Sequence, residues 1–490
     1  MEYKKIIKII KKQGFLIKYD KFKNKFKYLS YNSKDIKENT LFFCKGESFK
    51  KKYLQEAIKK GATCYISEID YDVEIPKIIV TDIRKTMAII SKAFYDKKKK
   101  DIRIGITGTK GKTTTLNFIK NIINNYTSTL NAYMSTIDYY TGKVKKDSNT
   151  TTKESLDIYK CIKDMHDSNI KYLILELSSQ GEKLDRIYNM TFDIGIFLNI
   201  DIDHISPKEH SDFNEYFMCK LNILKKCKKV ILNYHCNKYE LIKKELQKNK
   251  IKVYSYGLNP KCDFYISEIN NKKNTFYVCY KNIKEEYKLS IKGYFNILNA
   301  TSSIGVAKLL NIPYKSIKEG LLSTIVPGRM EIYNIDKCPI IVDYAHNKLS
   351  IETIFKLIKK EYPNKDIKLI FGTPGNKAIN RRLEIANLVK KYNVYFYITE
   401  DDPNHENLNE ICNQIKNNLD NLKYSNYEII LNREQAIKKA LIKKTNNDII
   451  LCLGKGEETH QIRKGKYIKI KSDSQVIKEF SSNKKFNNKL

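Results

Sequence analysis

The sequence predicts an α/β protein of three domains, in which a central doubly wound sheet is flanked by an N-terminal α/β domain and a C-terminal Rossmann-like α/β domain. The chain has 490 residues, too many for one ordinary core, and this length favours about three domains. Short apolar runs of the buried, parallel-strand type alternate with segments of helical periodicity. The pattern restarts near Pro327 and Gly328. We therefore predict domains at residues 1–100, 101–325 and 326–490.

The first domain is predicted to begin with a helix and to continue with short alternating strands and helices. "MEYKKIIKIIKKQGF" at the N-terminus has amphipathic spacing, but neither the long apolar core nor the small-residue cleavage site of a signal peptide. "NTLFFCKG" (39–46) and "KIIVTD" (77–82) predict strands, and "KKYLQEAIKKGA" (51–62) predicts a helix that Gly61 ends. A lysine run at 97–100 marks the domain boundary.

The second domain shows the alternation expected of a doubly wound sheet, because helical segments separate its apolar strands. The predicted strands are "DIRIGITG" (101–108), "KYLILELSS" (171–179), "FDIGIFLNI" (192–200) and "KVILN" (229–233). The predicted helices are "KTTTLNFIKNIIN" (112–124) and "NILNATSSIGVAKLLNI" (296–312).

The third domain is predicted to form a second, separate α/β sheet. Its strands are "PIIVDYAH" (339–346), "IKLIFG" (367–372), "VYFYIT" (394–399) and "DIILCLG" (448–454). Helices lie between them, including "NREQAIKKALIKK" (432–444).

The composition narrows the class of protein. No run of about 18 apolar residues occurs, so we expect no membrane span, and without a signal peptide we expect a cytoplasmic protein. The eleven cysteines form no CxxC pair, which favours reduced thiols over disulfides or a structural zinc site. A net charge of +36 would suit nucleic acid. Lysine is spread along the whole chain, however, so we expect a solvated basic surface and no nucleic-acid partner.

The segment "GITGTKGKTTT" (105–115) predicts a phosphate-binding loop between a strand and a helix. Gly108 and Gly111 let the backbone approach a ligand closely, Lys112 would neutralise the β- and γ-phosphates, and the Thr113 hydroxyl suits magnesium. The first glycine of the common phosphate-loop pattern falls on Ile106, and the chain offers Gly108 instead. A plain glycine turn is the alternative. The predicted nucleotide contacts are Thr107, Gly108, Thr109, Lys110, Gly111, Lys112, Thr113 and Thr114.

Polar side chains follow two of the neighbouring predicted strands. "ILELSSQ" ends one strand at Glu176, and "LNIDIDH" ends another with Asp201, Asp203 and His204. Magnesium takes hard oxygen ligands, and metal sites often gather at the ends of neighbouring strands. Capping a helix or turn is the commoner role for any one such residue. Beside a phosphate loop, we predict that Glu176 and His204 contribute to a metal site.

Six motifs in order, "TGTKGKTT", "ELSSQG", "NIDIDHI", "GYFNILNA", "VPGRME" and "DYAHN", make the chain resemble the Mur ligases from about residue 30 to about residue 470. Within that family it is most similar to the enzymes that add the third amino acid to UDP-N-acetylmuramoyl-L-alanyl-D-glutamate. The resemblance implies an ATP-dependent ligase of peptidoglycan precursor synthesis that uses ATP and Mg²⁺, and we expect it to act as a monomer. Folate polyglutamate synthases share the loop and the general plan, but they explain the remaining segments less well.

The resemblance implies that the first domain holds the uridine nucleotide and the second the sugar peptide. The family carries Asp-Ser-Arg where this chain has "YNSKD", so Ser33 is retained while Asn32 and Lys34 depart from the pattern. Lys153 stands where relatives often carry proline or glycine. The residues implied to contact the muramoyl-dipeptide are Thr151, Thr152, Ser178 and Arg186.

The resemblance also implies the catalytic centre. Lys220 in "DFNEYFMCKL" falls on the lysine that relatives carry as a carbamate (N6-carboxylysine), an anion able to hold a second magnesium. By residue type alone, Lys220 would be an ordinary surface lysine. The implied catalytic residues are Lys112, Lys220 and His204, and the implied metal ligands are Thr113, Glu176, His204 and Lys220. Near the ATP adenine, ribose and phosphates, the resemblance places Asn296, Asn299, Arg329 and Asp343.

The resemblance implies that the third domain binds the incoming amino acid and selects it. Enzymes that add meso-diaminopimelate usually carry Asp-Asn-Pro-Arg, whose arginine grips the second carboxylate of that substrate. This chain has Asn404 in place of the arginine and an added anion at Asp402, which favours L-lysine. Glu458 of "GKGEE" matches a residue that diaminopimelate enzymes use, so meso-diaminopimelate is the alternative. The implied amino-acid contacts are Asp401, Asp402, Pro403, Asn404, Gly454 and Glu458.

Three other functions compete with this prediction. A ligase like the folate polyglutamate synthases has the same architecture. A basic P-loop ATPase acting on nucleic acid would need aromatic and basic stacking platforms, whereas the tyrosines here are scattered. A scaffold with a dead nucleotide site is disfavoured because Lys112, Thr113, Glu176 and His204 are intact.

Overall fold

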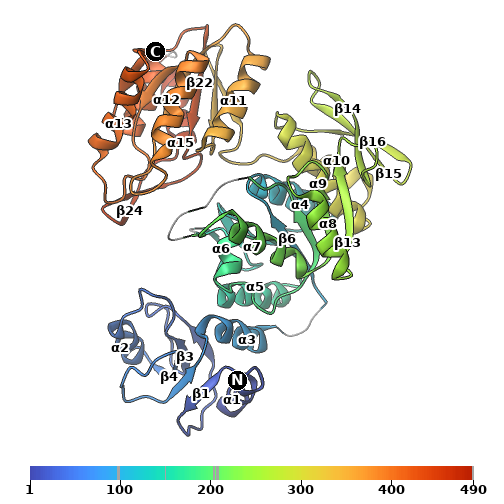
Figure 1. Ribbon diagram of the computed structural model, residues 1–490, viewed down its shortest axis with the longest axis vertical. Coiled ribbons are helices and arrows are strands. Elements are labelled where there is room, and N and C mark those ends of the chain that lie inside the picture. The colour runs from blue at the N-terminus through green and yellow to red at the C-terminus, as the bar shows by residue number, and fades with distance from the viewer. Residues whose placement is uncertain (97–99, 149, 202–204, 206–208, 488–490) are drawn as a thin grey trace. The chain divides into compact units, whose positions relative to one another are not determined.

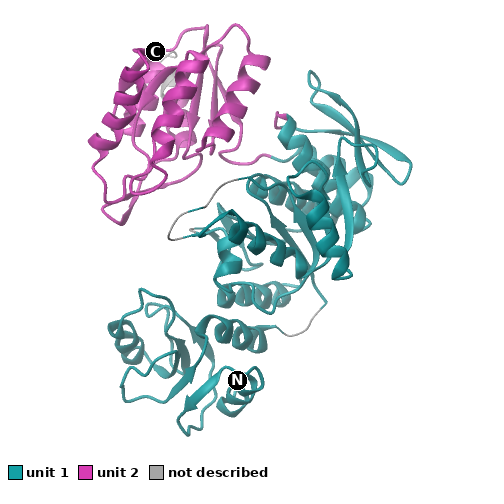
Figure 2. Cartoon of the chain, viewed as in Figure 1, with its two compact units in different colours: residues 1–290, 294–324 teal, residues 291–293, 325–490 magenta. Residues whose placement is uncertain are grey.

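The structure is a computed structural model, and it describes residues 1–96, 100–148, 150–201, 205 and 209–487. The chain divides into two compact units (Figure 2). Unit 1 comprises Met1–Ser290 and Tyr294–Thr324, and unit 2 comprises Ile291–Gly293 and Ile325–Leu490. The first two predicted domains both fall in unit 1, so the three-domain division stays a prediction.

A five-stranded sheet with strand order β1-β5-β4-β3-β2 forms the N-terminal part of unit 1. Its strands are β1 (Leu16–Tyr19), β2 (Tyr28–Ser30), β3 (Thr40–Phe43), β4 (Ala62–Ser67) and β5 (Lys77–Val80), and its helices are α1 (Tyr3–Lys12), α2 (Lys51–Lys59) and α3 (Ile83–Tyr95). Ile6 and Ile10 on one face of α1 are buried, as the amphipathic spacing predicts. Gly61 follows α2 with φ +105°, a conformation that glycine adopts without strain.

An eleven-stranded sheet forms the rest of unit 1, in the order β16-β15-β14-β13-β12-β11-β6-β10-β7-β8-β9. Figure 1 labels β6, β13, β14, β15 and β16 of this sheet. Pairing is parallel from β14 to β7 and antiparallel beyond both. The strands are β6 (Ile102–Thr107), β7 (Ala132–Met134), β8 (Asp138–Tyr140), β9 (Lys145–Asp147), β10 (Tyr172–Glu176), β11 (Phe192–Phe197), β12 (Cys227–Asn233), β13 (Lys252–Gly257), β14 (Phe264–Asn270), β15 (Thr275–Tyr280) and β16 (Ile283–Lys288). The helices are α4 (Lys112–Thr127), α5 (Ser155–Asp167), α6 (Ser179–Lys183), α7 (Phe213–Lys225), α8 (Tyr239–Lys248), α9 (Tyr294–Leu309) and α10 (Tyr314–Leu322).

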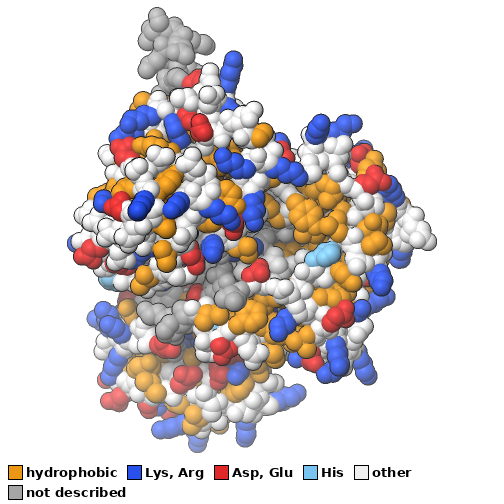
Figure 3. Space-filling model, turned by 45° about the horizontal axis from the view of Figure 1, so that its top comes forward, with side chains coloured by type: hydrophobic (Ala, Val, Ile, Leu, Met, Phe, Trp, Pro, Cys, Tyr) orange, Lys and Arg blue, Asp and Glu red, His pale blue; other side chains and the backbone are white. Residues whose placement is uncertain are grey.

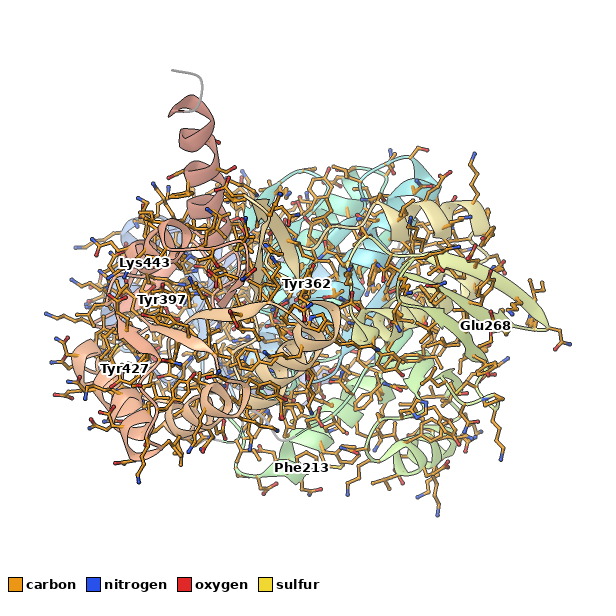
Figure 4. The ribbon with its side chains drawn as sticks, turned by 90° about the horizontal axis from the view of Figure 1, so that it is seen from above. Phe213, Glu268, Tyr362, Tyr397, Tyr427 and Lys443 are labelled. Atoms are coloured by element: carbon orange, nitrogen blue, oxygen red, sulfur yellow. The ribbon has the colours of Figure 1, made fainter. Side chains whose placement is uncertain are left out.

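The four strands predicted for this sheet are confirmed as β6, β10, β11 and β12, and they lie side by side at its centre. The antiparallel extensions were not predicted from the sequence. Glu268, labelled in Figure 4, lies on β14 in one of them. Their strands carry exposed and half-buried residues, so they lack the continuous apolar run that marks a strand buried on both faces.

Unit 2 contains a six-stranded sheet with strand order β17-β18-β22-β19-β20-β21, and only β17 is antiparallel to its neighbour. The strands are β17 (Glu331–Ile335), β18 (Cys338–Asp343), β19 (Asp366–Phe371), β20 (Tyr395–Ile398), β21 (Tyr427–Ile429) and β22 (Asp448–Leu453), and a separate hairpin pairs β23 (His460–Arg463) with β24 (Lys466–Lys469). The helices are α11 (Lys348–Glu361), α12 (Asn380–Tyr392), α13 (Leu408–Asn421), α14 (Arg433–Ile442) and α15 (Asp473–Asn487). Figure 4 labels Tyr397 and Tyr427 on the neighbouring strands β20 and β21.

The surface is basic without one dominant cluster on the face drawn in Figure 3. Lys and Arg side chains there are interspersed with Asp, Glu and apolar side chains, which is the distribution that a solvated basic surface predicts. None of the helices in the described residues is long and apolar enough to cross a bilayer.

A buried ion pair joins three elements of unit 2. Arg433 at the start of α14 donates to both carboxylate oxygens of Asp473 at the start of α15, at 2.7 and 2.6 Å. It also donates to the carbonyl of Leu453, the last residue of β22, at 2.8 Å. Both side chains of the pair are nearly inaccessible, so losing one partner would leave a buried charge unpaired.

We expect Arg433→Met to lower the free energy of unfolding of unit 2 by about 3–5 kcal/mol, because Asp473 would remain buried without its cation. Urea unfolding measures this change. Lys416→Met is the matched control, since it breaks the exposed pair with Asp420 on α13 and should leave the free energy of unfolding nearly unchanged. Similar losses in the two variants would contradict the role given to the buried pair.

Candidate active site

The loop between β6 and α4 turns at two glycines whose neighbours leave no room for a side chain. Gly108 has φ +154°, and a Cβ there would lie 2.9 Å from the Leu198 Cβ. Gly111 has φ +86°, and its Cβ would lie 2.6 Å from the Asn299 Oδ1. The backbone therefore needs glycine at both positions. The Gly111 contact also brings Asn299 of α9 onto the predicted phosphate loop.

Asn199, just beyond the end of β11, holds the loop from the other side. Its carbonyl accepts from the Thr109 N–H at 3.0 Å, and its side-chain amide exchanges hydrogen bonds with the backbone of Lys110 at 2.9 and 3.2 Å. The Thr109 hydroxyl bonds with the Tyr216 hydroxyl at 2.9 Å. These contacts fix the loop before any ligand arrives.

Two lysines meet at one backbone atom of the loop. Lys112 and Lys220 each donate to the carbonyl of Gly108 at 2.9 Å. Lys220 extends from α7, is only 2% exposed, and lies 4.7 Å from the centre of the Tyr216 ring. The structure thus places Lys220 inside the site, where residue type alone would have made it a surface lysine. An anionic group at this loop would meet both ammonium groups.

Glu176, at the end of β10, lies beside the first turn of α4. One of its carboxylate oxygens accepts from the hydroxyls of Thr113 at 3.2 Å and Thr136 at 2.9 Å, and the other accepts from the Thr136 N–H at 3.1 Å. Burial raises the pKa of Glu176, while Lys112 and the hydrogen bonds from Thr136 and Thr113 act to lower it. A buried carboxylate whose neighbours are hydroxyls can serve as a metal ligand.

The residues predicted to hold magnesium are brought together in part. Thr113, Glu176 and Lys220 all surround the loop, and the Thr113 and Glu176 oxygens 3.2 Å apart are the hard donors that Mg²⁺ prefers. His204 lies outside the described residues, so its predicted role stays a prediction. Within the ranges that the structure describes, no group of three or more His, Cys, Asp or Glu side chains could hold a metal ion.

The residues predicted to contact the dipeptide form a second connected group at the same edge of the sheet. The Thr151 hydroxyl bonds with that of Thr136 at 3.1 Å, and Thr136 also bonds Glu176. The Thr152 hydroxyl bonds with that of Ser178 at 3.1 Å. Arg186 donates to the Thr152 carbonyl at 2.9 Å. The network joins the predicted dipeptide contacts to the predicted metal ligand.

Three cations surround a single carboxylate next to this group. Glu154 pairs with Lys45 at 3.1 Å, Arg186 at 3.1 Å and Arg84 at 3.7 Å. The three cations exceed the one carboxylate, which makes this part of unit 1 suited to an anionic ligand. Ser33 lies in the N-terminal part and donates to Glu56 at 2.8 Å, so its hydroxyl already has a structural partner.

In unit 2, the residues predicted to choose the amino acid surround a buried lysine. Lys455, which is 1% exposed, lies 2.6 Å from Glu458, 2.9 Å from Asp402 and 3.8 Å from Asp401. Burial raises the pKa of Asp401 to about 6, against the lowering effect of Lys455. Burial alone would lower the pKa of Lys455, but the three carboxylates outweigh it and raise that pKa. Gly454 directly precedes this lysine, with φ +103°.

Asn404 and Pro403 are held by the backbone beside these carboxylates. Asn404 has φ +55°. Its N–H donates to the Ile462 carbonyl at 2.9 Å, and its carbonyl accepts from the Lys464 N–H, both in the β23–β24 hairpin. The Pro403 carbonyl lies so close to Gly375 that a Cβ on that glycine would be 1.9 Å from it. The "DDPN" segment is therefore a fixed turn.

Arg329 and Asp343 lie near each other at the end of β18. Asp343 accepts from the backbone N–H groups of Met330 and Ala345, each at 2.8 Å. The Arg329 guanidinium lies 4.4 Å from the centre of the Tyr344 ring. Tyr344 in turn hydrogen-bonds Glu458, and burial, together with Glu458, raises its pKa. A continuous chain of contacts thus runs from Arg329 to the carboxylates around Lys455.

Five residues of these sites were not singled out from the sequence. Thr136, Asn199, Tyr216 and Tyr344 each bond or stack with a predicted residue, yet as single polar residues at strand ends, in loops or on a helix they carry no motif. Lys455 lies within the quoted "GKGEE", but its burial is invisible in a chain with 91 lysines and arginines.

Comparisons with known proteins match this arrangement. Residues 106–307 match the description of the Mur ligase middle domain, and residues 328–456 match the Mur ligase glutamate ligase domain. The chain is 35% identical to the UDP-N-acetylmuramoyl-L-alanyl-D-glutamate–L-lysine ligase of Enterococcus faecalis, over 88% of this chain and 87% of that protein. It is also 35% identical to the ligase of the same name from Streptococcus mutans, over 96% of each.

A solved structure shares the fold. It is described as a UDP-N-acetylmuramoyl-L-alanyl-D-glutamate–2,6-diaminopimelate ligase, and it covers 99% of each chain with a TM-score of 0.66 at 21% identity. At that identity the likeness establishes the fold, and the Enterococcus and Streptococcus proteins are the nearer guides in sequence.

We expect Gly111→Ala to weaken nucleotide binding at least tenfold, because its Cβ would overlap the Asn299 amide and the backbone would be strained at φ +86°. Isothermal titration with ADP and with a non-hydrolysable ATP analogue measures the change.

Gly14→Ala is the control for backbone strain alone. Gly14 has φ +73°, but a Cβ there would have no atom within 4 Å. It should lose stability without losing nucleotide affinity. Unchanged nucleotide affinity in Gly111→Ala would show that the loop is not the nucleotide site.

Proposed function

The chain belongs to the Mur ligase family, and from this premise we propose that it uses ATP to join L-lysine to UDP-N-acetylmuramoyl-L-alanyl-D-glutamate. This reaction is a step in the synthesis of peptidoglycan precursors. We place it in the cytoplasm, where ATP is available. The family assignment favours a ligase over a nucleic-acid ATPase or a scaffold with an inactive nucleotide site.

The choice of L-lysine rests on the group of carboxylates in unit 2. Asp401, Asp402 and Glu458 lie around one buried ammonium, and Asn404 stands where an arginine would bind a second substrate carboxylate. Negative charge in a buried site favours a cationic side chain and disfavours a carboxylate. The 35% identity to two ligases named for L-lysine supports the same choice.

The glutamate carboxylate of the dipeptide is a poor electrophile, so it must be activated before an amine can attack it. A carboxylate oxygen of the dipeptide's glutamate attacks the γ-phosphorus of ATP, so that an O–P bond forms, the bond to the β-phosphate oxygen breaks, and ADP leaves. The amine of lysine then attacks the acyl carbon of the resulting acyl phosphate. A C–N bond forms, inorganic phosphate leaves, and the amine loses its proton to solvent.

The cations of unit 1 are suited to the first step. Carboxylate and triphosphate repel each other, and Lys112 supplies positive charge at the loop where the phosphates would lie. We propose that Arg186 binds a carboxylate of the dipeptide through its planar fork of donors. Most of the rate enhancement would come from positioning and from charge neutralisation.

Magnesium would be held by Thr113, Glu176, His204 and a carbamylated Lys220, and when bound it would neutralise phosphate oxygens. Carbamylation joins the Lys220 nitrogen to CO₂: the ammonium loses one proton before it attacks and a second when the C–N bond forms, so a cation is replaced by an anion. We also propose that Asn296 and Asn299 lie near the adenine, that Arg329 and Asp343 lie near the ribose and phosphates, and that Ser33 contacts the uridine nucleotide.

Phosphate release tests the proposal directly. Purified protein with ATP, Mg²⁺ and the UDP-linked dipeptide should release phosphate when L-lysine is added, and the product should gain the mass of one lysyl residue. Pteroate in place of the UDP-linked dipeptide tests the folate-ligase alternative, and meso-diaminopimelate in place of lysine tests the alternative amino acid. Faster turnover with either replacement would overturn the proposed substrate.

We expect Asn404→Arg to raise the ratio of diaminopimelate to lysine turnover by at least tenfold, because a guanidinium can pair with the second carboxylate and opposes an ammonium. Competition between the two amino acids in one tube, scored by product mass, measures the ratio.

Asn404→Gln is the matched control for that substitution. Both variants place a longer side chain at φ +55°, where asparagine is tolerated best, but only arginine adds charge. A ratio that changes equally in the two variants, or in neither, would show that charge at this position does not select the substrate.

We expect Lys220→Ala to lose at least about a hundredfold in kcat and to be partly restored by acetate or formate, since a small carboxylate can occupy the space of the carbamate. Lys225→Ala, on the same helix and partly exposed beside Glu245, should keep wild-type activity. Full activity in Lys220→Ala without added carboxylate would exclude the carbamate.

A further inference from the structure

The carboxylate group of unit 2, defined here as Asp401, Asp402 and Glu458, already contains a cation that belongs to the protein. The Lys455 ammonium is within 3 Å of Glu458 and Asp402 and 3.8 Å from Asp401. Three negative charges and one positive charge leave two negative charges in excess. An arriving ammonium is thus attracted to a group that is already partly neutralised.

Two of the neighbouring arginines are already paired with other carboxylates. Arg433 is paired with Asp473 through two hydrogen bonds. Arg463 is paired with Glu400, which follows β20, through three hydrogen bonds at 2.6, 2.7 and 3.1 Å. Among the described residues of unit 2, the ion pairs recorded for the carboxylate group are those with Lys455.

The geometry shows how firmly Lys455 holds two of the three carboxylates. One Asp402 oxygen accepts from both the Lys455 ammonium at 2.9 Å and the Ile462 N–H at 3.0 Å. Glu458 lies three residues after Lys455, and it also accepts from Tyr344. Asp401 lies farthest from the ammonium, and it is also buried, with only 9% of its surface exposed. Its carboxylate is therefore the least satisfied of the three.

We propose that Lys455 is a specificity-determining positioning residue, whose ammonium fixes Asp402 and Glu458 and cancels one charge, so that the group accepts one further ammonium: the side-chain amine of a diamino acid. This inference rests on the proposed function. Lys455 itself would not contact the reacting atoms. The amino acid selected has one cationic end and no second carboxylate, because an anion would face two uncancelled negative charges.

Loss of the Lys455 charge should change how lysine binding depends on pH. Asp401 has a pKa of about 6, raised first by burial and further by Asp402 and Glu458, and lowered by Lys455 and Arg433. The other charged and titratable groups around it include Tyr344, Arg329, Asp343 and the Glu400–Arg463 pair. Loss of the Lys455 charge removes a lowering influence, so the pKa of Asp401 must rise. The carboxylate form, which binds an ammonium, is then lost at a higher pH.

The experiment compares Lys455→Met with the wild-type ligase in the phosphate-release assay. We expect the KM for lysine to rise at least tenfold with kcat within about twofold, since a buried charge pair is lost but the reacting groups are intact. The acid limb of the kcat/KM profile for lysine should move to higher pH. Lys455→Arg should keep both values near wild type. Lys368→Met is the control, because it removes a largely buried lysine that is paired with Asp448 at 2.7 Å on neighbouring strands. It should move neither KM nor the limb.

A double variant separates charge from structure. Asp402→Asn combined with Lys455→Met restores the net charge of minus two, so the acid limb should return toward wild type. A residue that only supports the fold would instead give a double variant as impaired as the single one or worse, and the limb would not return. This comparison holds even where Lys455→Met loses stability.

Two further results would overturn the inference. A lower KM for lysine in Lys455→Met would make Lys455 a competitor of the substrate. An unchanged KM and acid limb, with kcat or melting temperature reduced, would make it a structural residue. A wild-type chain that releases no phosphate with lysine would instead overturn the proposed function, and the inference with it.

Discussion

The carbonyl of Gly108 is the atom on which the site of unit 1 depends. It accepts from Lys112 of α4 and from Lys220 of α7, each at 2.9 Å, and so joins two helices that are far apart in the sequence. The carbonyl can take this position because Gly108 has no side chain to meet Leu198. A substitution that turned this peptide would move both ammonium groups at once. The positions of both lysine nitrogens are therefore set by one backbone conformation.

The two units gather opposite charges, and this division matches the two substrates of an amide-forming ligase. Unit 1 presents Lys112 and Arg186, which suit the phosphates and carboxylates of anionic substrates. Unit 2 presents three carboxylates around Lys455, which suit an amine. Buried charges cost free energy unless they are paired, so each unit keeps an internal partner for its charges in the absence of ligand: Glu154 for Arg186 and Lys455 for the carboxylates.

The sequence could predict the parts of the fold that depend on local pattern. The strand, loop and helix around "GITGTKGKTTT" follow from apolar runs and glycines, and β10, β11 and β12 follow from buried parallel-strand composition. The antiparallel strands β8, β9 and β14–β16 could not be predicted, because their residues are half exposed and their pairing depends on distant neighbours. Several residues of the candidate site could not be predicted from local sequence either. Thr136 and Tyr216 act through contacts made only in the folded chain, and Lys455 differs from the other lysines only in its burial.

The transfer of oxygen from the acid to phosphate tests the central claim most directly. The UDP-linked dipeptide would be prepared with ¹⁸O in the side-chain carboxylate of its glutamate, and the phosphate released with ATP and L-lysine would be analysed by mass spectrometry. If the carboxylate captures the terminal phosphoryl group, each turnover places one ¹⁸O atom in inorganic phosphate and leaves one in the amide product. Phosphate that carries only unlabelled oxygen, from a reaction that still forms the amide, would contradict activation of the acid by phosphorylation.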